Sequence, residues 1–352
     1  MAAFLLANAI QPEPMGGWIL EQTKLISNIV NSPVCVSDPE LQSWLETEGG
    51  SIFTCPRWDS LDRTVAPLTI NQTMAVVFGG TAPTPNAIPT HIEQMVRLER
   101  AQVWSATKLA KYFNKDQADP IQAIVNDIAG YWAYRDQAAF LAAWVGVFAD
   151  NDAAPAGTEH TQGDLTLDVS DSGNFEDGVT NFTAENAIEC VGLMGDAEDD
   201  LGYIVTHSKV RRTMEKNDLL DVVKDSTPGR LSSYRGRPII VNDSMTKGSG
   251  NVYHTYFFGA GSTAVAMAQP DVPFEIARYA DGGNGAGQEA VWSRIRRSIH
   301  PYGHKFVGSF TANTGGPTDA TTSGNLGHAG SWERTVRERK QIKAARLITT
   351  EG

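Results

Sequence analysis

The residues best suited to bind a cofactor lie in the glycine-rich stretch 259–264, which reads Gly-Ala-Gly-Ser-Thr-Ala. The stretch follows an expected strand and matches the G-x-G-x-x-A pattern of dinucleotide-binding folds, with Asp281 near the distance of a ribose-binding carboxylate. In those folds a helix must start directly after the glycines, so that the pyrophosphate lies at its N-terminus. Pro270 and Pro273 leave too few residues for that helix. The sequence therefore favours a tight turn between antiparallel strands and predicts no cofactor.

Two histidines, His300 and His304, have a spacing at which one face of a helix can present both imidazoles to a metal ion. Pro301 and Gly303 lie between them and oppose a helix. No cysteine or carboxylate nearby in the sequence completes a ligand set. We therefore expect a turn at the end of a strand and no metal site.

Two acidic stretches, which begin at Asp168 and Asp196, could each suggest a cation site. The first imitates the start of an EF-hand calcium loop, but Val179 occupies the last ligand position, where a bidentate glutamate is required. The second follows an expected helix and fits a solvated turn. The sequence also lacks the motifs of serine hydrolases, P-loop enzymes, zinc proteases and kinases. It predicts no catalytic residues and no enzyme.

Three arginines, Arg294, Arg296 and Arg297, lie close to Trp292, a combination that also occurs on nucleic-acid-binding surfaces. The chain as a whole is acidic, with 29 basic and 41 acidic residues and a net charge of −12. In an acidic protein a short basic strand more often forms ion pairs between subunits, so we assign these arginines to subunit contacts. We expect neither sequence-specific DNA binding nor attraction to a membrane.

The remaining composition is typical of a soluble protein made in a reducing compartment. With 352 residues and 41% hydrophobic content, the chain can form two or three compact units. Its three cysteines are odd in number and form no C-x-x-C pair, which argues against a disulfide scaffold. Arg135 and Asp136 interrupt the best candidate membrane span, and the apolar N-terminal run lacks the basic residues of a signal peptide.

The N-terminal part of the sequence cannot form a core of its own, because proline and glycine keep its elements short. Residues 1–48 mix short apolar runs with frequent proline and glycine, and residues 49–87 are strand-like pieces broken by the same residues, as in a long hairpin. Such a hairpin is marginal alone in water. Because ordering a residue costs about 1–2 kcal/mol of backbone entropy, both segments need contacts from another surface, and neighbouring subunits are the simplest source.

Residues 91–150 carry the clearest helical spacing. Apolar residues at three- and four-residue steps predict one helix from about Ile92 and a longer one from Asp119-Pro120 to Phe148, where the proline occupies a favourable first position. The longer helix would measure about 43 Å, long enough to serve as a spine.

After residue 150 the periodicity alternates between strands and helices, which indicates a mixed α+β fold. Thr183 with Glu185 forms a capping pattern at the start of one helix. The expected helices are 183–196, 208–222 and 332–345, and the expected strands are 165–169, 203–205, 238–241, 252–258, 264–267, 273–280, 288–299 and 346–349.

Several segments together resemble the major capsid proteins of tailed phages, which have the Hong Kong 97-type fold. Their order and spacing over most of the chain carry the resemblance. The matching segments are Gly49-Gly50, Trp104-Ser105 at an expected helix start, Asp119-Pro120, residues 129–132 with Arg135, and residues 205–208, 236–243, 253–256, 259–261 and 300–303.

The resemblance implies an α+β fold of that type, with a mixed α/β axial domain. Its parts would be an N-terminal arm (1–48), an extended E-loop hairpin (49–98), a peripheral domain with the spine helix (99–182, continued by strands in 271–310) and the axial domain (183–270 and 311–352). It further implies assembly through pentamers and hexamers into an icosahedral shell that encloses double-stranded DNA. The protein would then be located in the virion, after synthesis in the host cytoplasm.

The resemblance also suggests partners and contact residues. Because no long charged helical extension precedes the fold, we expect a separate scaffolding protein and a portal, and we leave a decoration protein open. On the hairpin, Trp58 or Phe78 is expected to anchor in a pocket of a neighbouring subunit. Two alternatives stay open, an encapsulin-like compartment shell of the same fold and an NAD-dependent enzyme that uses residues 259–264.

Overall fold

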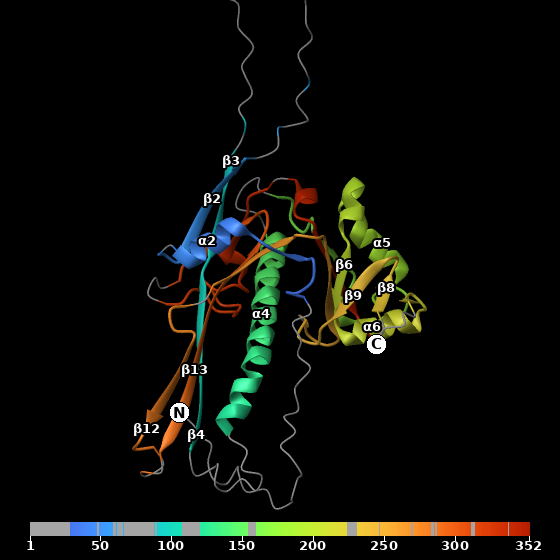
Figure 1. Cartoon of the computed structure of the whole chain (residues 1–352). Coiled ribbons are helices and arrows are strands. Elements are labelled where there is room, and N and C mark those ends of the chain that lie inside the picture. Colours follow the sequence, from blue (N-terminus) through green and yellow to red (C-terminus); the bar gives the residue numbers. More distant parts are fainter. Residues whose placement is uncertain are drawn as a thin grey trace, which may run out of the picture.

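A long helix, α4 (Pro120–Asp152), runs through the middle of the molecule between two β-sheets (Figure 1). Its 33 residues span about 50 Å. The predicted spine helix is confirmed, and it continues past Phe148 to Asp152. The computed structural model describes residues 29–47, 49–58, 90–107, 120–153, 160–223, 231–245, 247–268, 270–282, 287–310, 314–336 and 338–352, with positions 61, 66, 88 and 285.

A five-stranded sheet covers one side of α4, and its central strand is β13 (Gln288–Pro301). Both edges of β13 are occupied, because β4 (Leu98–Thr107) pairs with residues 288–297 from one side while other strands pair from the other. These are β12 (Phe274–Tyr279), β11 (Thr263–Ala268) and, beyond β11, β1 (Cys35–Ser37). The two extended segments expected around residue 284 are thus confirmed as β12 and β13.

The helix predicted from Ile92 is wrong, because the chain forms two strands there. β3 (Thr90–Val96) and β4 belong to different sheets, and Trp104-Ser105 lies inside β4 rather than at a helix start. Ten consecutive residues of β4 pair with β13 from Leu98↔Arg297 to Thr107↔Gln288. This pairing with a distant strand outweighs the helical spacing of the apolar residues, as tertiary context often does.

A seven-stranded sheet lies on the other side of α4, with α5 (Ala184–Gly192) and α6 (Ser208–Lys216) at its flank (Figure 1). Thr183 caps α5 as predicted, with its side chain accepting a hydrogen bond from the Asn186 amide at 3.1 Å. The strands in spatial order are β5 (Thr166–Asp168), β16 (Ala344–Thr350), β10 (Val252–Phe258), β6 (Tyr203–Thr206), β9 (Arg237–Val241), β8 (Leu231–Tyr234) and β7 (Asp221–Val223).

Of the three helices expected after residue 150, the one over 183–196 ends at Gly192, the next is also shorter than predicted, and the last is absent. The helix expected over 208–222 ends at Lys216, because Asp218 takes a left-handed conformation (φ 53°) and the chain turns into β7. The helix expected over 332–345 is absent. In its place β15 (Trp332–Arg334) pairs with β14 (His304–Phe306), a short 3-10 turn spans Arg339–Gln341, and β16 has already begun at Ala344.

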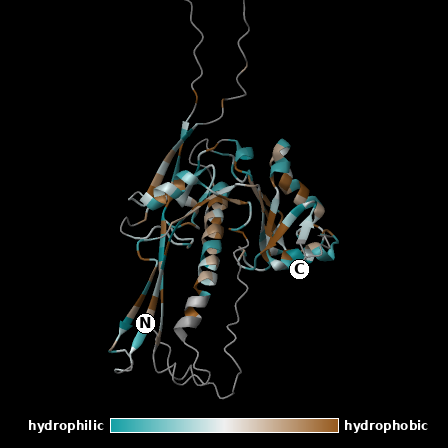
Figure 2. Ribbon diagram, viewed as in Figure 1, coloured by the Kyte–Doolittle hydropathy of each residue, from teal (hydrophilic) through white to brown (hydrophobic). Residues whose placement is uncertain are grey.

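The core joins α4 to both sheets. Phe140 and Trp144 of α4 lie against Phe258 of β10, with ring centroids 5.7 and 4.8 Å apart. On the other side, Trp132 donates a buried hydrogen bond to Ser293 Oγ of β13 at 2.8 Å. Figure 2 shows the apolar residues gathered along the C-terminal half of α4, where the helix is most deeply buried. Within the described part of the chain, no helix meets the length and hydropathy of a membrane span.

Candidate assembly surface

A β-hairpin extends from the body of the molecule at the end of the spine helix (Figure 1). β2 (Ile52–Trp58) pairs antiparallel with β3, from Ile52↔Val96 to Trp58↔Thr90. Because side chains alternate along a strand, each strand contributes to two faces. The outer face carries Ile52, Thr54, Pro56, Trp58, Thr90, Ile92, Gln94 and Val96, and the inner face carries Phe53, Cys55, Arg57, His91, Glu93 and Met95.

The outer face of the hairpin exposes large apolar side chains. Trp58 is 75% exposed, Ile92 is 51% exposed and Ile52 is 42% exposed. Pro56, which is also exposed, pairs directly with Ile92. A two-sided ribbon normally turns such residues towards its own core. Trp58, Pro56 and Ile92 therefore form an apolar patch with the character of a surface that another molecule covers, and the pair of Thr54 with Gln94 separates Ile52 from it.

The inner face shows the opposite polarity, because it buries charge. The Glu93 carboxylate is only 2% exposed, and Arg57 and His91 beside it are half-buried. Nearer the body the inner face is apolar, since Phe53 stacks on Trp44 at 5.3 Å and Met95 packs with Leu41. At its outer end, therefore, the hairpin has its charges inside and its apolar residues outside.

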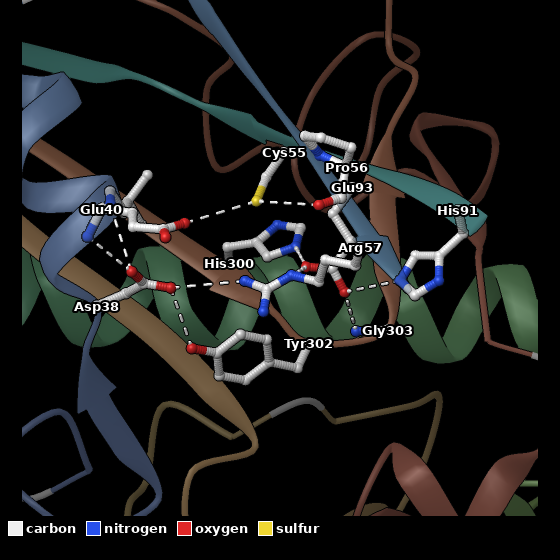
Figure 3. Close-up of polar contacts among 11 residues, drawn as sticks. Asp38, Glu40, Cys55, Pro56, Arg57, His91, Glu93, His300, Tyr302 and Gly303 are labelled. Carbon is white, nitrogen blue, oxygen red and sulfur yellow. Dashed lines mark hydrogen bonds and ion pairs between the residues drawn. The ribbon is translucent and has the colours of Figure 1, made fainter. Parts of the chain in front are cut away.

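The buried charges form one connected group, here called the Glu93 cluster and shown in Figure 3. Arg57 Nε lies 2.6 Å from Glu93 Oε2, and the Gly303 amide donates to Glu93 Oε1 at 3.1 Å. Two imidazoles complete the surroundings of this carboxylate. The cluster comprises Asp38, Arg57, His91, Glu93, His300, Tyr302 and Gly303.

Both histidines approach Glu93 without a close hydrogen bond to it. His91 Nε2 lies 3.7 Å from Oε1 and His300 Nε2 lies 3.9 Å from Oε2. Burial lowers the pKa of His300 to about 3, with His304 and Arg57 adding to the effect. His300 is therefore neutral at physiological pH, and the guanidinium of Arg57 is the group that balances the Glu93 charge.

A second carboxylate shares Arg57 with Glu93. Asp38 Oδ2 lies 3.6 Å from the Arg57 guanidinium and accepts a hydrogen bond from the Tyr302 hydroxyl at 3.3 Å. Burial, aided by Asp38, raises the pKa of Tyr302 to about 12, so its hydroxyl stays protonated. Burial alone would lower the pKa of Arg57, but Glu93 and its other neighbours raise it above its usual value. Arg57 is therefore a permanent cation between two carboxylates.

The predicted contact residues have different surroundings. Trp58 is the most exposed large apolar side chain of the described residues, whereas Phe78 lies outside them. The three arginines pair within their own chain, and their role in subunit contacts stays a prediction. Arg294 contacts Glu275 at 2.8 Å, Arg296 contacts Glu99 at 2.8 Å, and Arg297 pairs with Asp136 of α4.

The two histidines singled out from the sequence lie at a strand end, as predicted, with His300 in β13 and His304 in β14. Folding also brings a carboxylate from a distant segment to them, because Glu93 of β3 lies 3.9 Å from His300. Even so, no group of three or more potential metal ligands occurs among the residues the structure describes.

The glycine-rich stretch 259–264 joins the two sheets. The sequence predicted a turn between paired strands, but β10 and β11 belong to different sheets, so that detail is wrong. Strand β11 follows directly, in the place where a nucleotide site requires a helix. Gly259 is needed for close packing, since a Cβ there would lie 2.7 Å from the backbone oxygen of Asp200.

Both acidic stretches have partners inside the chain. Asp168 Oδ1 accepts hydrogen bonds from the amide and hydroxyl of Ser170, at 2.9 and 2.7 Å, and so shapes its own loop. In the other stretch Asp196 pairs with Lys340 and Asp200 lies 3.8 Å from Lys343.

The Glu93 cluster is the feature that sequence reasoning missed. Its members come from segments far apart in the chain, and the helical interpretation of residues 91–98 hid the two-residue alternation of β3. Arg57 lies between apolar Pro56 and Trp58, and His91 and Glu93 lie on either side of Ile92. This alternation would have indicated a hairpin with one polar face.

Comparison with proteins of known function identifies the family. No family model matches this chain. The major capsid protein of Bacillus phage SPP1 is 31% identical over 346 residues, which cover 97% of this chain and 96% of that protein. This chain belongs to the phage major capsid proteins. As a capsid shell subunit it associates with further copies of itself and is located in the virion.

Solved capsid structures confirm the fold of this major capsid protein. The capsid of cyanophage Pam1 gives a TM-score of 0.53 at 15% identity and covers 100% of this chain and 99% of that one. The capsid of Ralstonia phage GP4 gives a TM-score of 0.52 at 9% identity, with coverage of 91% and 87%. At these identities the likeness concerns the fold alone, and the Hong Kong 97-type α+β fold expected from the sequence is confirmed.

Proposed function

We propose that this capsid protein assembles through pentamers and hexamers into an icosahedral shell around double-stranded DNA, without any catalytic role. The observation that carries the proposal is the inverted polarity of the hairpin. A subunit that worked alone would leave Trp58, Ile92 and Ile52 in water, although each gains about 1.5–3 kcal/mol on full burial. A neighbouring subunit that covers this face recovers that free energy.

Trp58 is the proposed anchor of this contact. Its indole offers the largest apolar area on the outer face, and tryptophan is enriched among the residues that dominate binding energy at interfaces. Ile92 and Pro56 flank it and supply apolar surroundings. Phe78, which lies outside the described residues, is proposed as a second anchor.

A second proposed contact lies at the edge strand β12. Phe274 and Ile276 are 59% and 65% exposed there, and Glu275 between them pairs with Arg294. An exposed apolar edge strand is a hazard in a lone protein, so a covering neighbour is favoured. Arg294 and Arg296 would then lie at the rim of a subunit contact, and Arg297 would support them from the α4 side of the sheet.

The wider arrangement is proposed from the family. The arm (1–48), the E-loop hairpin (49–98), the peripheral domain (99–182 and 271–310) and the axial domain (183–270 and 311–352) would divide the contacts of the shell between them. A separate scaffolding protein and a portal would assist assembly in the host cytoplasm, and a decoration protein would add to the finished shell where one exists.

Electron microscopy of the purified full-length protein tests the proposal, with and without co-expressed scaffolding protein. We expect closed shells of uniform size, tens of nanometres across. Uniform monomers or dimers in both preparations would overturn the proposal. DNA content is checked separately on particles from infected cells, where nuclease-protected double-stranded DNA is expected.

A further inference from the structure

We infer that Glu93 is a positioning residue, which fixes the hairpin to the body so that Trp58 is held in place for a neighbouring subunit. The inference deepens the proposed function and rests on it only for the role of Trp58. The attachment itself concerns a single chain and can be tested in unassembled subunits.

Glu93 contacts both strands of the hairpin, the strand β13 and the turn that follows β13. Arg57 belongs to β2, His91 and Glu93 itself belong to β3, His300 belongs to β13, and Gly303 belongs to the turn that follows. One carboxylate thus links both strands of the hairpin to the central strand of the five-stranded sheet. Among the described ionisable side chains that lie within 4 Å of Glu93, only Arg57 carries a permanent positive charge.

Arg57 extends the attachment to a third part of the body. Its guanidinium faces Asp38, whose other carboxylate oxygen accepts from the Glu40 amide at 3.0 Å and caps the first turn of α2 (Pro39–Thr47). The guanidinium also lies over the Tyr302 ring, 5.3 Å from its centroid. Glu93 and Asp38 therefore hold Arg57 from the hairpin side and from the body side (Figure 3).

Because of its position along the hairpin, the cluster determines where the side chains of the outer face lie. The apolar contacts of Phe53 and Met95 lie nearer the body, and the Glu93 cluster is the next layer outward. Trp58 directly follows Arg57, and Ile92 directly precedes Glu93. A backbone shift at either charged residue therefore displaces an apolar residue of the outer face.

A buried ion pair is poorly suited to add stability but well suited to specify one arrangement. Removing water from two charges costs nearly as much as their attraction returns, so an apolar pair would hold the hairpin as tightly. An apolar contact, however, tolerates sliding, whereas the Glu93 carboxylate accepts a hydrogen bond from the Gly303 amide and forms a close ion pair with Arg57. The cluster thus selects one orientation of the hairpin.

The test uses E93Q, with E99Q as the matched control. Glutamine keeps the size of Glu93 and an acceptor for the Gly303 amide but removes the charge that faces Arg57. Glu99 of β4 forms an ion pair of similar length with Arg296 of β13. The Glu99 side chain is more exposed than that of Glu93. Hydrogen exchange is measured on unassembled full-length subunits, and shell yield is measured on the same preparations by electron microscopy.

We expect amide exchange of residues 52–58 and 90–96 to accelerate roughly tenfold in E93Q, with exchange of β10 and β16 unchanged and E99Q like the wild type. Shell yield should fall in E93Q, while E99Q serves as the control for hydrogen exchange only. If the hairpin amides of E93Q exchange at the wild-type rate, the inference is overturned, whether or not shell yield changes. Where E93Q gives no folded subunit, R57K provides the same comparison, because lysine keeps the charge but loses the rigid fork.

The two proposals fail in distinguishable ways. If the wild type forms no shells, the proposed function falls while the exchange measurement still decides the role of Glu93. If E93Q loosens the hairpin and yet assembles as well as the wild type, the attachment stands and the link to Trp58 positioning falls.

Discussion

Arg57 and Trp58 are consecutive residues of β2 that project from opposite faces of the hairpin. Arg57 lies 2.6 Å from the buried Glu93 carboxylate, whereas Trp58 is 75% exposed. An inward-facing charge and an outward-facing indole are therefore coupled through one peptide unit. The two residues have different roles. Arg57 positions the hairpin, and Trp58 is available to contact the molecule that covers the outer face.

Replacing Trp58 by alanine should impair assembly and leave the subunit intact. The side chain makes little contact with its own chain, so the free energy of unfolding should change by less than about 0.5 kcal/mol. Shell yield at a fixed protein concentration should fall several-fold, and the double variant W58A/F78A should fall further. Thr54→Ala on the same face is the control and should assemble normally. Unchanged yield and thermal stability in W58A/F78A would disprove the anchoring role.

Gly146 and Gly130 of the spine helix should respond in opposite ways to alanine. A Cβ at Gly146 would lie 2.1 Å from the Leu326 backbone oxygen and 2.5 Å from the Trp332 ring, so G146A forces the helix away from its neighbours. We expect the free energy of unfolding of G146A to fall by about 1–3 kcal/mol. Gly130 is exposed and has only an Asp127 oxygen nearby, at 3.3 Å. The free energy of unfolding of G130A should rise by up to about 1 kcal/mol, because alanine has a higher helix propensity than glycine. Denaturant unfolding of both variants measures the contrast.

The sequence predicted the elements whose signal is local. The spine helix combines continuous three- and four-residue spacing with the Asp119-Pro120 start, and Thr183 marks the start of α5 through its own capping bond. Five strands of the seven-stranded sheet (β5, β6, β9, β10 and β16) were recognisable as short runs of apolar residues between turn residues, whereas β7 and β8 were not predicted.

What the sequence did not predict depends on partners far along the chain. β4 is a strand because β13 pairs with it, and the sequence from Leu98 to Thr107 contains no signal that predicts this pairing. The same holds for Glu93, whose neighbours Arg57 and His300 come from other strands. A single charged residue in a strand does not reveal whether it is buried. Only the alternation on both strands of the hairpin carried that information.

Trp132 fastens the spine helix to the five-stranded sheet by a hydrogen bond that can be removed with little change in shape. Its indole nitrogen donates to Ser293 Oγ, and both side chains are buried. W132F keeps an aromatic ring but leaves the Ser293 hydroxyl without this donor, which should cost about 1–3 kcal/mol. Calorimetry of the unassembled subunit measures the loss. The double variant W132F/S293A should recover part of it, because no buried hydroxyl is then left unpaired. A double variant less stable than W132F would contradict this explanation.

Acid should destabilise the subunit through His300 and His304. Burial is the main cause that lowers the pKa of each to about 3, well below the usual value of 6.5. Between these two values the unfolded chain takes up a proton at each histidine and the folded chain does not. Stability should therefore be unaffected above pH 7 and decline as pH falls below about 6.5, by up to about 1.4 kcal/mol per pH unit for each histidine.

Glutamine variants separate this effect from the titration of carboxylates. H300Q and H304Q should each flatten the dependence of the unfolding free energy on pH between about pH 6.5 and pH 5, where most carboxylates are still ionised. Above pH 7 each variant should run parallel to the wild type, which makes that range an internal control for the polar substitution itself. Equal slopes for the wild type and both variants below pH 6.5 would show that the two imidazoles are protonated in the folded subunit. In that case His300 would be a cation beside Glu93, and Arg57 would no longer be the single group that balances this carboxylate.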